Sequence, residues 1–217
     1  MKSKKAGSKN RRGLLWMYIG AAFLLAALLL TAYNIWEGLH ARHTSTDTVT
    51  ELREWLPDGA GDESAGEAIM DEGSPAPDYM KYPDMEMPVK TMNGIEYVGI
   101  LSIPVLQIEL PIANQWSYPN LKIAPCRYSG SAYQNNLIIC AHNYASHFGM
   151  IKNLRAGDLA VFTDMDGNEF IYHVVDREVL NPSDIPGMEA GYWDLTLFTC
   201  TIGGKSRVVI RFEQIDP

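Results

Sequence analysis

Apolar and polar positions divide the chain of 217 residues into segments of different character. Residues 14–36 form one uncharged apolar run, residues 37–88 are mostly polar, and residues 89–217 contain short runs in which apolar and polar positions alternate. Alternation with a period of two is typical of half-buried β-strands, whereas a long unbroken apolar run indicates a membrane-spanning helix. The pattern therefore predicts an apolar helix, a polar linker and a β domain.

The apolar run at 14–36 is long enough to cross a membrane as a helix, because a rise of about 1.5 Å per residue covers a hydrocarbon layer of roughly 30 Å. Aromatic residues typical of membrane interfaces lie near both of its ends: Trp16, Tyr18, Tyr33 and Trp36. A cleaved signal peptide is the alternative, but its apolar core is usually about 7–15 residues and precedes a small-residue cleavage site. The length of this run favours an uncleaved single-pass anchor.

Charge is distributed unevenly along the chain. Residues 1–36 hold six basic residues and no acidic one, which leaves a net charge of −14 on the rest because the whole chain carries −8. Basic residues before an apolar run predict a cytoplasmic tail at 1–13 and an extracellular location for everything after residue 36. The acidic body argues against a nucleic-acid partner, since phosphate binding requires clustered Lys and Arg.

Residues 37–88 are rich in Asp, Glu, Gly, Ser and Pro and poor in branched apolar residues. Such a composition buries too little surface to offset the entropy lost on ordering the backbone. We therefore expect an acidic extracellular stalk that separates the anchor from the folded domain. One short helix is expected within it at 48–56, with Thr46 or Ser45 as its N-cap.

Residues 89–217 contain β-branched runs separated by Gly, Asn, Asp and Pro. This pattern predicts an all-β domain that closes into a small barrel. Asp166-Gly167 lies between two such runs and predicts a hairpin. Two short helices are expected, at 146–154 and at 119–123.

The clearest candidate for chemistry is the stretch DLTLFTCTIGGKSRVVIRF at 194–212. If Gly203-Gly204 forms a hairpin turn, Cys200 pairs with Arg207, and directly opposed residues have Cβ atoms about 4.5–5.5 Å apart on one face. A neighbouring guanidinium lowers the pKa of a thiol and stabilises an oxyanion. The alternative is that Cys200 is a buried structural cysteine, since free Cys is often buried.

A cysteine nucleophile also needs an imidazole that accepts its proton and returns one to the leaving amine. His142 follows the apolar run LIICA, where a side chain emerges at the rim of a barrel, and His147 lies five residues later. The position at the strand end favours His142 over His147.

These residues lie in a sequence that resembles the sortase family, the membrane-anchored cysteine transpeptidases of Gram-positive surfaces. The TLxTC signature of that family matches residues 196–200, and an arginine stands seven residues after the cysteine. VGILSIPVLQIELPI resembles the first barrel strands of the family, and LRAGDLAVF resembles the element after its histidine. The similarity covers most of residues 96–212 in the expected order. It implies a sortase-type barrel of about eight strands over 89–217.

The resemblance implies a role for three residues: Cys200 as the nucleophile, His142 as the general acid/base, and Arg207 as the residue that stabilises the oxyanion. Ala141 stands where many sortases have glycine, a small change. The run HNYASHFGMIKNL is more similar to class B sortases than to class A, although the segment at 180–194 is short for a long inserted helix, so the subclass stays open.

Thr199, Leu197 and Asn143 are expected to contribute to substrate binding. The implied reaction cleaves an LPxTG-like sorting motif of a surface protein through a thioester, and transfers the acyl group to an amine of a peptidoglycan precursor or a pilin. This chemistry needs no cofactor and no metal.

The sequence gives less support to four alternative interpretations: a peptide-binding barrel, a papain-like hydrolase, a zinc site and a calcium site. A degenerate sortase that only binds peptides or cell-wall components would keep the anchor, the stalk and the barrel. A papain-like hydrolase would have its cysteine before its histidine, the reverse of the order here. A zinc site at Cys140, His142 and Cys200 has weak spacing, and Asp164, Asp166 and Glu169 resemble a fragment of a calcium loop. Cys126 and Cys140 would form a disulfide only if their strands were adjacent.

Overall fold

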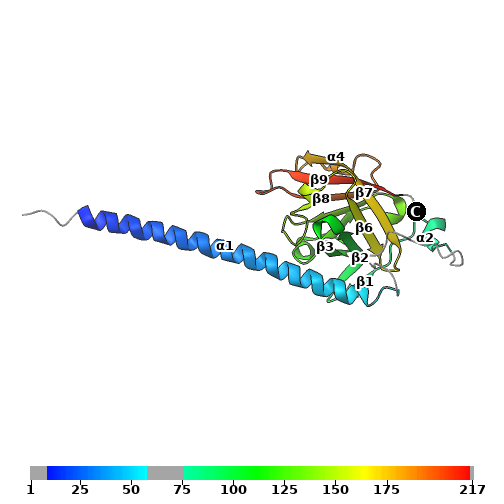
Figure 1. Cartoon of the computed structure of the whole chain (residues 1–217), viewed down its shortest axis with the longest axis horizontal. Helices are drawn as coiled ribbons and strands as arrows, with labels where there is room; N and C mark the ends of the chain where they lie inside the picture. The colour runs from blue at the N-terminus through cyan, green and yellow to red at the C-terminus, as the bar shows by residue number, and fades with distance from the viewer. Residues whose placement is uncertain (1–8, 58–75, 216–217) are drawn as a thin grey trace, which may run out of the picture. The chain divides into compact units, whose positions relative to one another are not determined.

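The computed structural model describes residues 9–57 and 76–215, and the part before Ala41 forms a unit separate from the part that follows. The first unit consists of helical residues of α1 (Lys9–Arg53). Within α1, Gly13–Trp36 is long and apolar enough to cross a membrane. The predicted apolar helix is therefore present (Figure 1).

The prediction of a separate helix at 48–56 with its own N-cap was wrong. Ser45 and Thr46 lie inside α1, which continues to Arg53, and two further turns lead to Pro57. No proline interrupts the sequence between residues 9 and 56, so nothing ends the helix earlier.

The second unit contains nine strands, all within residues 76–215: β1 (Lys90–Met92), β2 (Ile95–Ile103), β3 (Ile108–Ala113), β4 (Cys126–Ser129), β5 (Leu137–Ala141), β6 (Leu159–Asp164), β7 (Glu169–Leu180), β8 (Leu195–Cys200) and β9 (Arg207–Gln214). Their order is β1-β2-β3-β4-β5-β8-β9-β7-β6, and pairing of β6 with β2 closes eight of them into a barrel, as expected. The pairs β3–β4 and β5–β8 are parallel and the other pairs antiparallel.

The helices of this unit are short: α2 (Asp78–Lys81), α3 (Tyr118–Leu121), α4 (Ile185–Glu189), and the 3-10 turns η1 (Pro104–Leu106), η2 (Ala132–Gln134) and η3 (Ile151–Asn153). The helix expected at 119–123 corresponds to α3, whose N-cap Ser117 accepts a hydrogen bond from the Asn120 backbone at 3.1 Å. The helix expected at 146–154 is instead a series of turns followed by η3.

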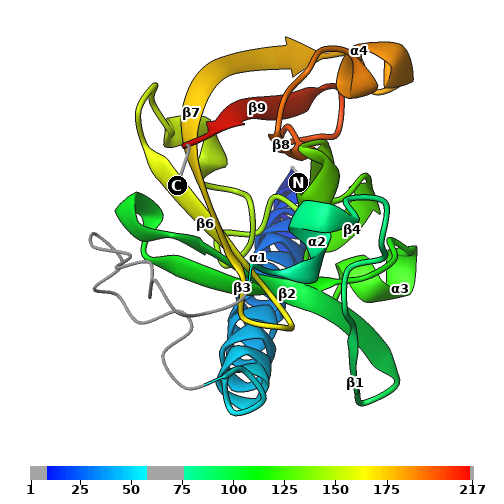
Figure 2. The ribbon, with the colours of Figure 1, turned by 90° about the vertical axis from the view of Figure 1, so that its right-hand side faces the viewer.

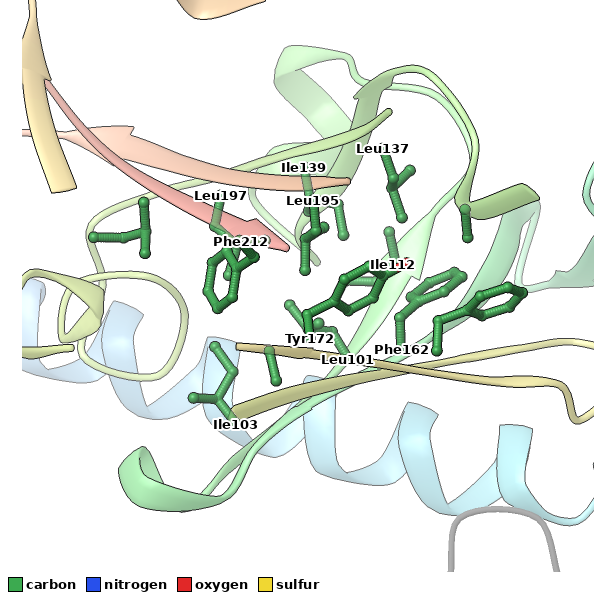
Figure 3. Packing of buried hydrophobic residues seen from close by; sticks show 14 of the residues in the cluster. Leu101, Ile103, Ile112, Leu137, Ile139, Phe162, Tyr172, Leu195, Leu197 and Phe212 are labelled. Carbon is green, nitrogen blue, oxygen red and sulfur yellow. The ribbon is translucent and has the colours of Figure 1, made fainter. Parts of the chain in front are cut away.

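The interior of the barrel is filled by apolar side chains that alternate along the strands, as Figure 3 shows. Leu195 and Leu197 of β8 face this core, as do Ile210 and Phe212 of β9, and all four are fully buried. Because side chains of a strand alternate between two faces, the residues between them point outward. The outward face of β8 and β9 therefore carries Cys200 and Arg207 (Figure 2 shows both strands).

The predicted stalk contacts the barrel at both of its ends. Val49, Leu52 and Leu56 are buried in a second apolar cluster with residues of the barrel exterior, and Met87 is buried with the main core. Arg53 of α1 also forms an ion pair with Glu109 of β3. These contacts belong to the second unit, which begins at Ala41. Residues 58–75, the middle of the predicted stalk, lie outside the described residues, and the boundaries at 36/37 and 88/89 stay predictions.

The predicted hairpin at Asp166-Gly167 joins β6 and β7. The buried carboxylate of Asp164 accepts hydrogen bonds from the backbone of Asp166 and Asn168, both at 2.9 Å, from the Asn168 side chain at 2.8 Å and from the Tyr133 hydroxyl at 2.6 Å. Four donors thus satisfy Asp164. In the described residues no three His, Cys, Asp or Glu side chains are grouped closely enough to hold a metal ion, which leaves the calcium and zinc alternatives without support.

Candidate active site

A pocket of about 270 Å³ opens on the outward face of the barrel, and Cys200, His142 and Arg207 all line it. Three separate segments bring these residues together, the ends of β8 and β5 and the start of β9. The strand pairing explains why they meet.

Cys200 lies directly opposite Arg207 in the antiparallel pair β8–β9, as the sequence predicted. The connection is longer than a two-residue turn, because strand pairing ends at this pair and Gly204 donates to the Thr201 carbonyl at 2.8 Å. Gly203 and Gly204 have φ of 82° and 71°, values that glycine adopts without steric cost. The glycines thus allow the hairpin that sets the Cys200–Arg207 register.

His142 reaches Cys200 through the parallel pair β5–β8. In that pair Cys140 lies beside Phe198 and Ala141 beside Thr199, so the next step of the register brings His142 beside Cys200. The Thr199 hydroxyl donates to the Ala141 carbonyl at 2.8 Å, which ties the two strands immediately before the histidine and the cysteine.

Arg207 is only partly buried, and its side chain makes few contacts. Its Nη1 donates to the carbonyls of Gly204 and Ser206, both at 3.3 Å and both within the hairpin. A guanidinium has five N–H donors, so these long local bonds leave donors for a negative charge in the pocket.

His147, the second candidate histidine, does not line the pocket. It is fully buried, and burial lowers its pKa to about 4, with a smaller contribution from the charge of His142. Its ring contacts Tyr144, whose ring in turn contacts His142, with centroids 5.5 Å and 5.0 Å apart. Neither ring nitrogen of His147 has a hydrogen-bond partner within the described parts of the chain. The accessible imidazole is therefore that of His142.

The three cysteines differ in exposure. Cys126 and Cys140 are buried, and burial raises the pKa of each thiol to about 12, whereas Cys200 is partly exposed. Cys126 and Cys140 lie directly opposite each other in β4–β5, so their strands are indeed adjacent, but both thiols are free. A neutral buried thiol is a poor nucleophile, which leaves Cys200 as the accessible one.

The three residues expected to bind substrate occupy different places. Thr199 lines the pocket, although its hydroxyl is engaged by Ala141. Leu197 is fully buried in the barrel core, because strand alternation turns it away from the face that carries Cys200. Asn143 is exposed next to His142 and lies outside the pocket lining. The position of Leu197 is therefore incompatible with direct substrate contact.

Two walls of the pocket were missed by sequence reasoning. One wall is aromatic, with ring centroids of successive neighbours 5.4–6.1 Å apart: Tyr118, Trp116, Tyr128 and Phe198. The other comes from the connection between β7 and β8 and includes Asp184, Ile185 and Met188 around α4. These residues come from separate loops without a common periodicity, so no pattern in the sequence indicated that they would meet.

A partly exposed thiol, an imidazole and a guanidinium in one pocket on the outward face of a closed β-barrel are the groups of a cysteine-dependent acyl-transfer enzyme. A family model described as the sortase domain matches residues 101–215, just over half of the chain. The chain therefore belongs to the sortase family and is a cysteine transpeptidase of that family. No curated protein matches the sequence.

Solved structures with the same fold include sortases of several kinds. Sortase C from Streptococcus pneumoniae is 22% identical, with a TM-score of 0.51 over 56% of this chain and 70% of that one. A lid mutant of sortase A from Corynebacterium diphtheriae is 18% identical, with a TM-score of 0.52 over 64% and 90%. The sortase D5 transpeptidase of Clostridium perfringens is 21% identical, with a TM-score of 0.51 over 64% and 88%. At these identities the likeness establishes the fold and leaves the subclass undetermined.

Proposed function

We propose that this protein is a membrane-anchored sortase that cleaves an LPxTG-like sorting motif and joins the new carboxyl end to an amine. Cys200 is the nucleophile, His142 the general acid/base and Arg207 the residue that stabilises the oxyanion. The observation that carries the proposal is that the one partly exposed cysteine lies opposite Arg207, directly after the Ala141–Thr199 pair that precedes His142, and that all three residues line one pocket.

In the first half of the reaction, the Cys200 thiolate attacks a peptide carbonyl carbon, and the carbonyl electrons move onto the oxygen. The Arg207 guanidinium stabilises that oxyanion as a charge-assisted hydrogen-bond donor. The tetrahedral intermediate collapses, the C–N bond breaks, and protonated His142 donates its proton to the departing amine. The product of this half is a thioester on Cys200.

In the second half, an incoming amine attacks the thioester carbonyl. His142, now neutral, accepts a proton from the amine, the C–S bond breaks, and the Cys200 thiolate is restored. One peptide bond has been broken and one formed, so no oxidant, reductant or cofactor is consumed. The amine would come from a peptidoglycan precursor or a pilin lysine.

The apolar helix Gly13–Trp36 supports the proposed location, with residues 1–13 in the cytoplasm and the barrel outside the cell. Six basic residues precede or begin this helix and no acidic residue does. An uncleaved anchor would keep the enzyme where both the surface protein and the cell-wall amine are accessible. The class B likeness of residues 142–154 stays a proposal as well.

The full-length chain in detergent, mixed with a panel of fluorogenic sorting-motif peptides, tests the function. We expect one peptide to form a thioester on Cys200, detected by mass spectrometry, and to be transferred when triglycine or a lysine peptide is added. C200A should form no adduct. C126A removes a buried thiol outside the pocket and should retain activity.

The opposite result is equally informative. If peptides bind but none acylates Cys200, and C200A binds them as well as the wild type does, the protein is the non-catalytic peptide-binding barrel.

A further inference from the structure

Arg211 is the largest fully buried side chain of the described residues, with 1% of its surface exposed. It lies on β9 four residues beyond Arg207 and on the same outward face, opposite Thr196 of β8. At about 3.4 Å per residue, the two arginines are about 14 Å apart along the strand. Arg211 is not part of the pocket lining, so it takes no direct part in the chemistry proposed for Cys200.

The guanidinium of Arg211 is bonded to three different elements. Its Nε donates to the Glu178 carboxylate of β7 at 2.6 Å, and its Nη1 donates to the Thr196 hydroxyl of β8 at 3.0 Å. The remaining bonds go to α4, from Nη1 to the Met188 carbonyl at 2.7 Å and from Nη2 to the Gly187 carbonyl at 2.6 Å. Arg211 thus joins α4 to the wall of the barrel.

Helix α4 has a fixed shape but is too short to hold its place on the barrel by itself. It has five residues, far fewer than an isolated helix needs for stability. Its N-cap Asp184 accepts a hydrogen bond from the Gly187 backbone at 2.9 Å, and a side chain at Gly187 would meet that carboxylate at 2.5 Å. The tight cap fixes the internal form of α4, and the bonds from Arg211 fix its place on the barrel.

The place of α4 matters because its residues form one side of the pocket. Met188 is buried and lines the pocket directly after the carbonyl of Gly187, and Ile185 lines the pocket with 52% of its surface exposed. If the two carbonyls were released, this wall would lose its hydrogen bonds to β9, and Ile185, which is exposed, would have little else to hold it relative to Cys200. A wall that must be ordered during binding weakens affinity by the cost of ordering it.

We propose that Arg211 is a positioning residue for peptide binding, which holds α4 so that the Ile185–Met188 wall is in place before the peptide arrives. The proposal rests on the proposed function. The proposal gives a role to a buried arginine that does not take part in the reaction. The two arginines of β9 then have different roles: Arg207 acts in the chemistry and Arg211 holds the pocket wall.

The test compares R211Q with the wild type, using the sorting-motif peptide that gives the highest rate in the full-length chain. We expect R211Q to raise KM by about tenfold or more, because bonds to a charged donor are lost from the wall. The kcat should change by less than about threefold, since Cys200, His142 and Arg207 keep their register. The rate of Cys200 alkylation by iodoacetamide should also be unchanged.

R177Q is the matched control. Arg177 lies on β7, is exposed, and donates to the Lys152 carbonyl at 2.6 Å, away from the pocket. Its replacement removes an arginine bond to a backbone carbonyl without affecting α4, so KM should stay at the wild-type value. R211K keeps the charge but replaces the planar fork with a single ammonium group, and an intermediate KM is expected.

A fall in kcat with KM unchanged, or a fall in Cys200 alkylation to match the loss of activity, would show a general structural role and overturn the proposal. If R211Q does not fold, R211K decides the question, and a wild-type KM in folded R211K would overturn it. Binding of the same peptide to C200A and to C200A/R211Q, measured by titration calorimetry, separates this proposal from the proposed function because binding needs no thioester. Equal affinity of the two variants would reject the positioning role, whereas no binding of the peptide to C200A would reject the proposed function on which that role rests.

Discussion

The two ends of the β8–β9 pair carry an arginine each, on one strand and on one face, and the two are used in opposite ways. Arg207 at the hairpin end is half-buried and makes two long hydrogen bonds to its own loop. Arg211 at the other end is 1% exposed and makes four bonds to three elements. The surroundings, rather than the residue type, decide whether a guanidinium is free for substrate or used by the fold.

The partners across the strand differ in the same way. Arg207 faces the Cys200 thiol, which gives it no strong hydrogen-bond acceptor, whereas Arg211 faces the Thr196 hydroxyl, an acceptor that it uses. A buried cation without full pairing is costly, so only the paired arginine can be covered by α4. Arg207, which has fewer partners, must stay near solvent, where its remaining N–H donors can bind a substrate.

The largest expected effect is the difference in alkylation rate between the partly exposed thiol of Cys200 and the buried thiols of Cys126 and Cys140. At pH 8, a thiol with a pKa of about 12 is about one part in ten thousand thiolate. Iodoacetamide should therefore label Cys200 at least about a hundredfold faster than Cys126 or Cys140, as peptide mapping by mass spectrometry would measure. Equal labelling of the three in the folded protein would contradict the assignment of Cys200 as the nucleophile.

Next in size is the loss of Arg207. We expect R207A to lower kcat by about a hundredfold to a thousandfold, as does the loss of one oxyanion donor elsewhere. Its melting temperature should stay within about 2 °C of the wild type, because the two bonds that are lost are long and lie within one hairpin. Steady-state kinetics and calorimetry on the same preparation would measure both. A large drop in melting temperature would mean that Arg207, like Arg211, serves the fold.

The matched experiment at the other end is R211M with thermal unfolding as the readout. R211M leaves the buried Met188 carbonyl and Thr196 hydroxyl without the donor they now have, at about 1–3 kcal/mol each, so R211M should melt several degrees lower than R207M. Denaturant unfolding of the two variants would give the difference in free energy. The contrast between the two arginines would disappear if both variants unfolded at the same denaturant concentration.

A smaller effect is expected from His147 in acid. Its pKa is depressed to about 4 in the folded state, so between about pH 6.5 and 4 the unfolded state binds a proton that the folded state does not. This linkage removes up to about 3 kcal/mol of stability as the pH falls through that window, and nothing above it. H147M should shift the acid-unfolding midpoint to lower pH, followed by circular dichroism. An unchanged midpoint would show that His147 is hydrated or paired on acidification.

The smallest effect is expected at Thr199. T199V removes the bond from the Thr199 hydroxyl to the Ala141 carbonyl, and a typical intramolecular hydrogen bond contributes about 0.5–1.5 kcal/mol. T199S keeps the hydroxyl and should restore most of the stability and of the activity. Parallel denaturant curves and peptide kinetics would measure this. If T199S were as impaired as T199V, the methyl group rather than the hydrogen bond would be the important feature.

The sequence was a good guide wherever local patterns decide the structure. Alternation predicted the barrel, and the Gly203-Gly204 pair predicted the Cys200–Arg207 register, although the loop proved longer than a two-residue turn. His142 was preferred over His147 because it ends a strand, and that argument agrees with its position on the pocket. Short-range geometry is encoded within a few residues, which is why these predictions were possible.

Predictions failed where distant parts of the chain decide the outcome. Leu197 was assigned to the substrate because it belongs to the signature, but pairing on both sides of β8 turns it into the core. Nothing near Arg211 in the sequence indicates that the carbonyls of Gly187 and Met188 will be its acceptors. Composition suggested an acidic spacer between anchor and domain and gave no sign that a few apolar positions such as Leu52 would pack its start against the barrel.

The parallel pairing of β5 with β8 has a consequence for how such an enzyme can change. Both strands end at the same edge, so the separation of His142 and Cys200 is set by hydrogen bonds between the two strands. The connections that follow β5 and precede β8 can then gain or lose residues without changing the distance between the two reacting groups. Residues 181–194, which include α4, could therefore be replaced by a different recognition loop, and the arrangement of Cys200 and His142 that carries out the chemical step would stay the same.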